Sequence, residues 1–412
     1  MEPSSEQIRK AIEQRMPEAR RLLETLIAIP SLSGQETAAM NAAAEAFEPF
    51  AQVSRVALSD SLKLDAHYSD PMPGLAYDGR FNLRTALPGT GNGRTLLLNT
   101  HIDTVPPSPG QESPYSPVET NGAIYGRGAC DAKGQIALLW LVMRIVADLG
   151  VETQGSLIGH IVVEEENGGN GTLAQIRHGE SADGCIVLEP TDMRVLTSIR
   201  GAIWFRMLVK GVAGHSGEAG RTRSALKTAI EVIDALEHYH AALLARSRHE
   251  PLFEPYSNPM PLTIGKLHAG NWPATAPGEA SLAGVLGFLP NMTASRVMEE
   301  VRQTIEAKIG PEAREIYDLH FTYRHDASVI EVNHPLVTAL VGSLRDIGIS
   351  ESPTAMTASC DAWFYNNLLG IPTLVFGAGR LAVAHSDQEH LRLDDLSRAA
   401  EALTHMALRW LF

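Results

Sequence analysis

The chain has 412 residues, a length that suits two globular domains, and 44% of its residues are hydrophobic while 20% are charged, as is ordinary for a globular protein. Its formal net charge is −14, and no basic stretch offsets this, so neither nucleic acid nor an anionic membrane is expected as a partner. The three cysteines have a spacing that fits neither a disulfide framework nor a zinc ribbon: Cys130, Cys185 and Cys360.

The N-terminal 20 residues are polar and contain no apolar stretch of the kind found in a signal peptide. No run of 18 apolar residues occurs, so no membrane span is expected. A soluble, cytoplasmic protein is the expectation that follows.

The first half of the chain alternates between short apolar runs and helical patterns. Apolar spacing predicts a helix over 5–28, and Pro17 inside it leaves open a kink or a break at that point. Apolar runs predict buried strands at 95–99, 156–163 and 185–188, a helix is expected at 136–149, and Gly-rich turns lie at 126–134 and 168–171. Strands alternating with helices predict an α/β fold with functional groups at the strand ends.

After residue 189 the pattern changes and later resumes. A β-like run at 195–210, helices at 224–240 and 294–309, and strands near 262, 282 and 317–323 predict a small inserted α+β domain. A helix at 335–347, a strand at 372–376 and a helix at 396–411 restore the α/β pattern. We therefore predict an α/β domain over 1–198 and 326–412, interrupted by a small inserted α+β domain over 199–325.

A histidine ends the first buried strand. His101 is followed two residues later by Asp103, and residues i and i+2 of a strand share a face. A carboxylate there can fix the tautomer of a metal-binding imidazole. The alternative is a surface histidine beside a helix-capping aspartate, and this segment alone does not decide between the two.

Acidic residues stand in two of the turns. Asp131 follows a Gly-rich turn that can bring its carboxylate to bridge two cations, although a lone aspartate there more commonly caps the next helix. Glu164, Glu165 and Glu166 come directly after an apolar strand, where three adjacent carboxylates are tolerated if cations neutralise them. The alternative for this second group is a solvated acidic loop.

Two further segments offer ligands. Glu189 ends an apolar strand and precedes a proline, so it is either a metal ligand or a charge that reaches solvent. His385 follows the glycine loop at 377–379, and a lone loop histidine is more often an ordinary surface residue. Taken together, however, two histidines, three carboxylates and one spare carboxylate are the set that a two-zinc hydrolase needs.

The order of these segments resembles the M20 family of zinc peptidases and amidohydrolases. That family includes acetylornithine deacetylase, succinyl-diaminopimelate desuccinylase, aminoacylase-1 and glutamate carboxypeptidases. The resemblance covers nearly the whole chain, and the matching motifs are at 101–103, 126–131, 165–169, 189–190, 384–386 and, in the insert, 214–217. It implies that 1–198 and 326–412 form a catalytic, metal-binding domain with a central mixed sheet, and that 199–325 form a ferredoxin-like dimerisation or lid domain.

The resemblance implies a ligand set for two zinc ions per chain. One ion would be held by His101, Asp131 and Glu189, and the other by Asp131 as a bridge together with Glu166 and His385. The same ligands tolerate Co²⁺ or Mn²⁺.

The resemblance also implies catalytic roles. Glu165 would be the general base, Asp103 would orient His101, and Glu164 would stay off the metal. In the family, the histidine that matches His215 reaches the active site of the partner subunit, which implies a homodimer. Without the family match, a simple turn around His215 would be the better interpretation.

Some positions depart from the family pattern. Many members carry a carboxylate-binding arginine late in the insert, but residues 286–290 contain none, which leaves Arg221 and Arg223 as possible replacements. Arg380, after the glycine loop, is either a carboxylate partner or a surface charge. Trp272 is expected in the core rather than in a pocket wall.

The predicted function is metal-dependent hydrolysis of the amide bond of an N-acyl amino acid. A dipeptidase or carboxypeptidase acting on a short peptide is the first alternative, because the same dizinc site serves both reactions. A protein that is not an enzyme is the second alternative: an inactive, zinc-binding homodimeric scaffold. The presence of Glu165 argues against it, because an inactive protein need not keep a general base.

Overall fold

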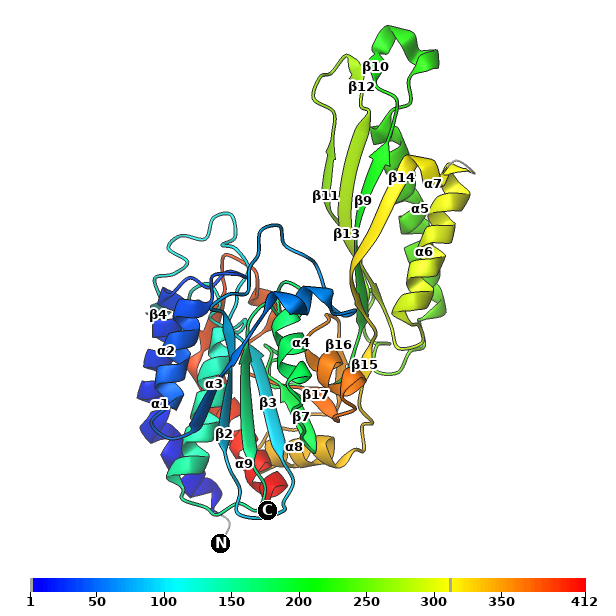
Figure 1. Cartoon of the computed structure of the whole chain (residues 1–412). Helices are drawn as coiled ribbons and strands as arrows, with labels where there is room; N and C mark the ends of the chain where they lie inside the picture. The colour runs from blue at the N-terminus through cyan, green and yellow to red at the C-terminus, as the bar shows by residue number, and fades with distance from the viewer. Residues whose placement is uncertain (1–2, 311–312) are drawn as a thin grey trace.

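The computed structural model describes residues 3–310 and 313–412, which form a larger and a smaller lobe (Figure 1). The larger lobe contains a nine-stranded mixed sheet in the order β1-β2-β6-β3-β7-β17-β8-β15, with β16 paired to β8. Its strands are β1 Gln52–Ala57, β2 Phe81–Leu87, β3 Leu96–His101, β6 Leu157–Val162, β7 Gly184–Val187, β8 Leu196–Ile199, β15 Ser328–Val329, β16 Thr354–Met356 and β17 Thr373–Val375. The predicted α/β fold with a central mixed sheet is therefore confirmed.

The centre of this sheet is parallel and buried. Strand β3 pairs in parallel with both β6 and β7, and all six of its residues are buried. A run of apolar residues suits such a strand, because both of its faces are covered by other parts of the fold. The carboxyl ends of β3, β6 and β7 consequently meet at one edge of the sheet.

In the part of the chain that the structure describes, six α-helices surround the sheet, and a small three-stranded sheet lies beside it. The helices are α1 Ser5–Ala28, α2 Thr37–Phe47, α3 Lys133–Asp148, α4 Asn170–Arg177, α8 Pro335–Asp346 and α9 Leu393–Leu411. Helix α1 packs on α3 and α9, and α9 also packs on α3 and α8. The small sheet has the order β18-β5-β4, formed by His390–Arg392, Ala123–Tyr125 and Val118–Thr120.

The smaller lobe has its own sheet and its own hydrophobic core. Strands β11 Leu262–Ala269, β13 Glu279–Phe288, β9 Gly201–Lys210 and β14 Tyr317–His325 form an antiparallel sheet in that order. Helices α5 Ala225–Arg246 and α6 Ala294–Ile309 pack on it, α7 Ala313–Ile316 follows, and the short pair β10 Gly214–His215 and β12 Thr275–Ala276 lies at the far end (Figure 1). The predicted boundaries of this lobe, 199–325, remain a proposal.

Alternating burial along β9 explains how the smaller lobe is built. Phe205, Met207 and Val209 are buried, whereas Arg206 and Lys210 on the opposite face are exposed. Such a period of two is expected when one face of a sheet is covered by helices and the other is more open.

Some expectations for local structure were wrong or incomplete. Helix α1 continues through Pro17, so no break occurs there. Helix α2 and strands β1 and β2 were not predicted, because the alanine-rich segment of α2 and the largely exposed edge strand β1 carry little apolar periodicity. Among the described residues, no helix combines the length and the hydrophobicity that crossing a lipid bilayer requires.

Candidate active site

Residues from three neighbouring strands meet at the carboxyl edge of the large sheet. His101 is the last residue of β3, Glu165 and Glu166 lie in the loop after β6, and Glu189 lies two residues beyond the end of β7. In an open α/β sheet, this edge is where ligands commonly bind. Asp131 joins them from the turn before α3.

The predicted metal ligands form two groups that share one residue. His101, Asp131 and Glu189 each place a ligand atom within 4.8 Å of the others, and so do Asp131, Glu166 and His385. The shared aspartate uses both of its oxygens, since its Oδ1 lies 3.1 Å from Nε2 of His101 and its Oδ2 lies 3.4 Å from Nε2 of His385. Two imidazoles therefore approach one carboxylate from two directions.

The charges of this cluster fit divalent cations. Burial raises the pKa of Glu189 well above its ordinary value, and repulsion from Asp131 adds to this against the attraction of His101. Burial also raises the pKa of Glu166, and Asp131 again contributes. A bound cation stabilises the ionised form of carboxylates that are crowded in this way. Imidazole nitrogens and carboxylate oxygens are donors that suit Zn²⁺. The residues present thus fit two such ions.

The structure rejects the simpler alternatives for three of these residues. Asp131 does not cap α3, because the N-cap position is Ala132 and no side-chain hydrogen bond is made there. Glu189 does not reach solvent, since only 5% of its surface is exposed, and His101 is 1% exposed. His385 is half exposed, but its Nε2 lies 3.0 Å from Oε1 of Glu166.

Three consecutive glutamates have different partners. Glu164 is fully buried, lies 2.5 Å from Nη1 of Arg80 and accepts a hydrogen bond from the Tyr77 hydroxyl, so it is turned away from the ligand cluster. Glu166 is in the cluster. Glu165 is partly buried, and burial followed by repulsion from nearby acids raises its pKa well above its ordinary value despite the attraction of His101. Within residues 3–310 and 313–412, its carboxylate makes no hydrogen bond.

Asp103 holds the loop of the glutamates as well as the histidine. Its Oδ1 and Oδ2 accept hydrogen bonds from the backbone N–H groups of Glu165 and Glu166, each at 3.1 Å. Nδ1 of His101 lies 3.1 Å from the backbone oxygen of Asp103 and 3.5 Å from its carboxylate. The backbone and the side chain of Asp103 therefore both contribute to the geometry around His101.

A buried ion pair that the sequence did not reveal supports two of the ligands. Nη1 of Arg127 lies 2.5 Å from Oε2 of Glu389, and both side chains are almost fully buried. Oε1 of Glu389 accepts a hydrogen bond from the backbone N–H of Asp131 at 3.2 Å. Nη2 of Arg127 donates to Oγ of Ser108, which donates in turn to the backbone oxygen of His385, both at 2.7 Å. The pair thus braces the backbone on both sides of the cluster.

Asp361 is another residue that the sequence did not reveal. Its carboxylate is fully buried and accepts hydrogen bonds from Thr172 Oγ1 at 2.6 Å and Asn99 Nδ2 at 3.1 Å. Burial raises its pKa to about 6. Asn99 lies on β3 two residues before His101, so Asp361 ties that strand to α4. No local motif marked this residue.

His215 lies away from the ligand cluster of its own chain. It belongs to β10, at the end of the smaller lobe farthest from the large sheet (Figure 1). The residue is exposed, and its Nδ1 accepts a hydrogen bond from the N–H of Gly217, as expected for a local turn. Within one chain, the structure therefore does not bring His215 together with the metal ligands.

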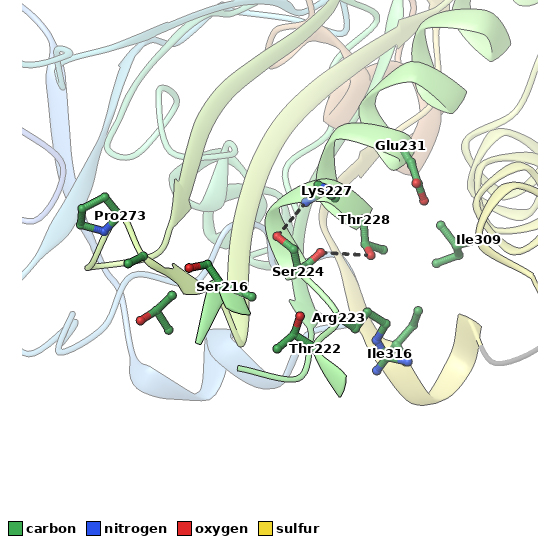
Figure 2. Close-up of a pocket in the computed structure, with 13 residues that line it drawn as sticks. Ser216, Thr222, Arg223, Ser224, Lys227, Thr228, Glu231, Pro273, Ile309 and Ile316 are labelled. Carbon is green, nitrogen blue, oxygen red and sulfur yellow. Dashed lines mark hydrogen bonds between the residues drawn. The ribbon is translucent and has the colours of Figure 1, made fainter. Parts of the chain in front are cut away.

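The arginines proposed as replacement anchors lie in the same outer region. Arg223 lines a cavity of about 670 Å³ that Ser216, Thr222 and Lys227 also border, and Figure 2 shows that these residues come from the start of α5 and the turns before it. Arg221 is exposed close by in sequence. Trp272 is 67% exposed, so the expectation of a core residue was wrong.

Comparison with known proteins agrees with the geometry. The chain is 27% identical over 345 residues to acetylornithine deacetylase of Aliivibrio fischeri, covering 81% of this chain and 85% of that protein. It is 25% identical over 365 residues to N-formyl-4-amino-5-aminomethyl-2-methylpyrimidine deformylase of Bacillus subtilis, covering 81% and 84% of the two chains.

Solved structures share the whole fold. Human carnosine dipeptidase 1 has a TM-score of 0.77 at 16% identity, covering 99% of this chain and 100% of that one. An M20 family metallo-carboxypeptidase of Sulfolobus solfataricus has a TM-score of 0.75 at 16% identity, with 96% and 99% covered. The model of peptidase family M20/M25/M40 matches residues 97–409. The chain therefore belongs to this family of metal-dependent hydrolases that act on amide or peptide bonds.

Proposed function

We propose that the chain is a dizinc amidohydrolase that removes the acyl group from an N-acyl amino acid. The observation that carries this proposal is the shared Asp131, whose two oxygens join two complete ligand groups beside the unpartnered carboxylate of Glu165. His101 and Glu189 complete one group, and Glu166 and His385 complete the other.

The chemistry follows from these positions. The two ligand groups would hold two divalent cations, and the chemistry supplied there would be a lowered pKa of a water molecule and a polarised amide carbonyl. Glu165 accepts a proton from the attacking water and delivers it to the leaving nitrogen, which is required because an amide anion is a poor leaving group. Asp103 keeps the Glu165 backbone in place through its hydrogen bond to that N–H.

A second chain would complete the site. His215 is exposed at the tip of the smaller lobe and would donate a hydrogen bond to the developing oxyanion in the active site of a partner subunit. The proposal thus includes a homodimer. We expect the dimer in the cytoplasm, with no role for nucleic acid or membrane.

The names of the relatives support deacylation. The curated relatives at 25–27% identity are a deformylase and a deacetylase, whereas the dipeptidase and carboxypeptidase among the solved structures share only 16% identity. Hydrolysis of a dipeptide at the same site is the second candidate, because only the substrate pocket separates the two reactions.

A substrate panel with metal analysis tests the proposal. The purified protein should contain about two zinc ions per chain, hydrolyse at least one N-acyl amino acid, lose activity on chelation and regain it with added Zn²⁺. Turnover of dipeptides alone would support the peptidase. Two bound zinc ions without turnover of any compound would support a scaffold and refute an enzyme.

A further inference from the structure

A small cavity lies beside the loops that carry two of the predicted metal ligands. It has a volume of about 220 Å³, and its lining includes Pro190, which follows Glu189. Leu381 and Ala382 also line it, in the segment that leads to His385. Residues that directly follow Glu189 and residues that shortly precede His385 in the sequence therefore line the same cavity. Its size suits one side chain or acyl group rather than a whole peptide.

One wall of the cavity carries a guanidinium group without an acidic partner. Arg194 is half-buried, and its Nη2 donates hydrogen bonds to the Tyr256 hydroxyl and to Oγ1 of Thr354, both at 2.9 Å. Among the described residues it forms no ion pair, and its Nε and Nη1 donate no hydrogen bond. Because arginine stays charged in proteins, these free donors favour a carboxylate as the missing partner.

A second arginine faces the same space. Nε of Arg380 lies 3.1 Å from Oδ1 of Asp192, and both side chains are largely exposed, at 63% and 45%. An exposed pair of this kind contributes little and rearranges readily. With two arginines and one aspartate in its lining, the cavity is net positive on a chain whose net charge is −14.

The surrounding backbone is held in place. The Tyr256 hydroxyl donates to the backbone oxygen of Ala355 at 3.1 Å, and Nε of the buried Arg200 donates to the backbone oxygen of Thr357 at 2.6 Å. Tyr256 belongs to the smaller lobe, so the cavity lies where the two lobes meet. The wall that carries Arg194 is thus held in place before any ligand arrives, which favours specific binding.

We propose that this cavity binds a carboxylate of the substrate and that Arg194 is its anchor. The inference rests on the proposed function and deepens it by naming the residue that would hold an acidic group of the substrate. Arg194 would take the place of the arginine that is missing from residues 286–290. The carboxylate has three possible sources: the α-carboxylate of the amino acid, an acidic side chain, or the far end of a dicarboxylic acyl group.

Three matched pairs of compounds distinguish these sources. They are N-acetylalanine against its amide, N-acetylglutamate against N-acetylglutamine, and N-succinylalanine against N-succinamoylalanine. The pair that changes the carboxylate bound by Arg194 should show the effect: the wild-type holoenzyme should prefer the acid of that pair over its amide by tenfold or more in kcat/KM. Arg194→Met should abolish that preference, mainly by raising KM for the acid.

Controls separate a lost anchor from a damaged fold. Arg194→Lys should restore part of the preference, since it keeps the charge without the planar fork. Arg21→Met, on the exposed face of α1, should change nothing. Bound zinc and the melting temperature of each variant should match the wild type. Equal acid-to-amide ratios in the wild type and Arg194→Met would overturn the proposal, as would a wild type with no preference in any pair.

The experiments distinguish a failure of the Arg194 subsite from a failure of the proposed deacylase function. If the wild type hydrolyses none of the six compounds, the deacylase proposal fails. Calorimetric titration of the same six compounds into the wild type and Arg194→Met then tests the subsite alone. Tighter binding of one acid that is lost in the variant supports it, and equal binding of acid and amide refutes it.

Discussion

Glu164 and Glu165 are neighbours in the chain but have opposite surroundings. Oε1 of Glu164 lies 2.5 Å from Nη1 of Arg80, and the residue is fully buried. Glu165 has no hydrogen-bond partner for its carboxylate among the described residues and lies in the field of His101 and Glu189. Because Glu164 lies at the end of a buried strand with a positive φ of 57°, the backbone turns there and separates the two side chains.

Replacing Glu165 tests its role as the base. Glu165→Gln should keep the metal content and the melting temperature of the wild type. Its kcat should fall by about 10²–10⁴, because a positioned general base supplies that factor. Steady-state kinetics beside metal analysis gives the result, and a variant with normal kcat would show that another group takes the proton.

Replacing its neighbour should have a different effect. Glu164→Gln removes a charge from a buried pair, and among the described residues Glu36, 2.7 Å from Nη2 of Arg80, remains as its acidic partner. We expect a loss of about 3 kcal/mol in the free energy of unfolding, typical of breaking a buried pair. Denaturant unfolding measures this loss. If Glu164→Gln were fully stable and inactive, the assignments of the two glutamates would have to be exchanged.

The buried pair of Arg127 and Glu389 should matter for metal affinity. Arg127→Met leaves the Glu389 charge unpaired beside the backbone of Asp131, so we expect affinity for zinc to fall by about 10- to 100-fold, as when other residues that orient ligands are changed. Ser108→Ala removes the hydrogen bond to the backbone of His385 and the one that Ser108 accepts from Arg127, but it keeps the ion pair of Arg127 with Glu389, so it should weaken mainly the second ion. Competition with a zinc chelator measures both, and unchanged affinity in both variants would exclude the bracing role.

Mixing two inactive variants tests the contribution of a partner subunit. His215→Ala and Glu165→Gln should each be inactive as homodimers. After the two are mixed and subunits exchange, a mixed dimer contains one site with an intact Glu165 and the partner's intact His215, so activity should return. No recovery, despite proven exchange by mass spectrometry, would place His215 in its own chain or outside catalysis.

Glu180 provides a test of pH dependence outside the active site. Although burial acts in the opposite sense, hydrogen bonds with His160 and Arg84 lower the pKa of Glu180 from 4.5 to about 2. A carboxylate whose pKa is lowered on folding stabilises the protein above its unfolded pKa and loses this effect as the pH falls toward the folded value. The stabilisation should therefore be complete above about pH 4.5 and disappear near pH 2.

The comparison with a variant isolates this effect. Glu180→Gln should be less stable than the wild type by about 2 to 3 kcal/mol at pH 6, and the difference should shrink steadily between pH 4.5 and pH 2. Glu13→Gln, at an exposed position on α1, provides the control and should show no such difference. A gap that stays constant with pH would refute the assigned pKa.

Much of the site could be predicted because its ligands follow apolar strands. The runs that end at His101 and shortly before Glu165 and Glu189 become parallel neighbours, so their ends must meet. The sequence could not show which charged side chains, far apart in the chain, pair with each other in the fold. Arg127 and Glu389 lie 262 positions apart, and although Arg127 falls within the motif at 126–131, nothing in that motif points to Glu389 as its partner.

Fold prediction failed where local signals were weak. The exposed edge strand β1 and the alanine-rich α2 have too little apolar contrast to be recognised. Trp272 was expected in the core because large aromatic residues usually pack there, but it lies in the outer loop that joins β11 to β12. Its position depends on the shape of the smaller lobe rather than on its own hydrophobicity.

A crystal structure with anomalous difference maps at the zinc absorption edge tests the central claim most directly. The account predicts two peaks per chain, one among His101, Asp131 and Glu189 and the other among Asp131, Glu166 and His385, with Asp131 touching both. A protein that hydrolyses its substrate with no peak at Asp131, or with its metal held by other residues, would contradict it.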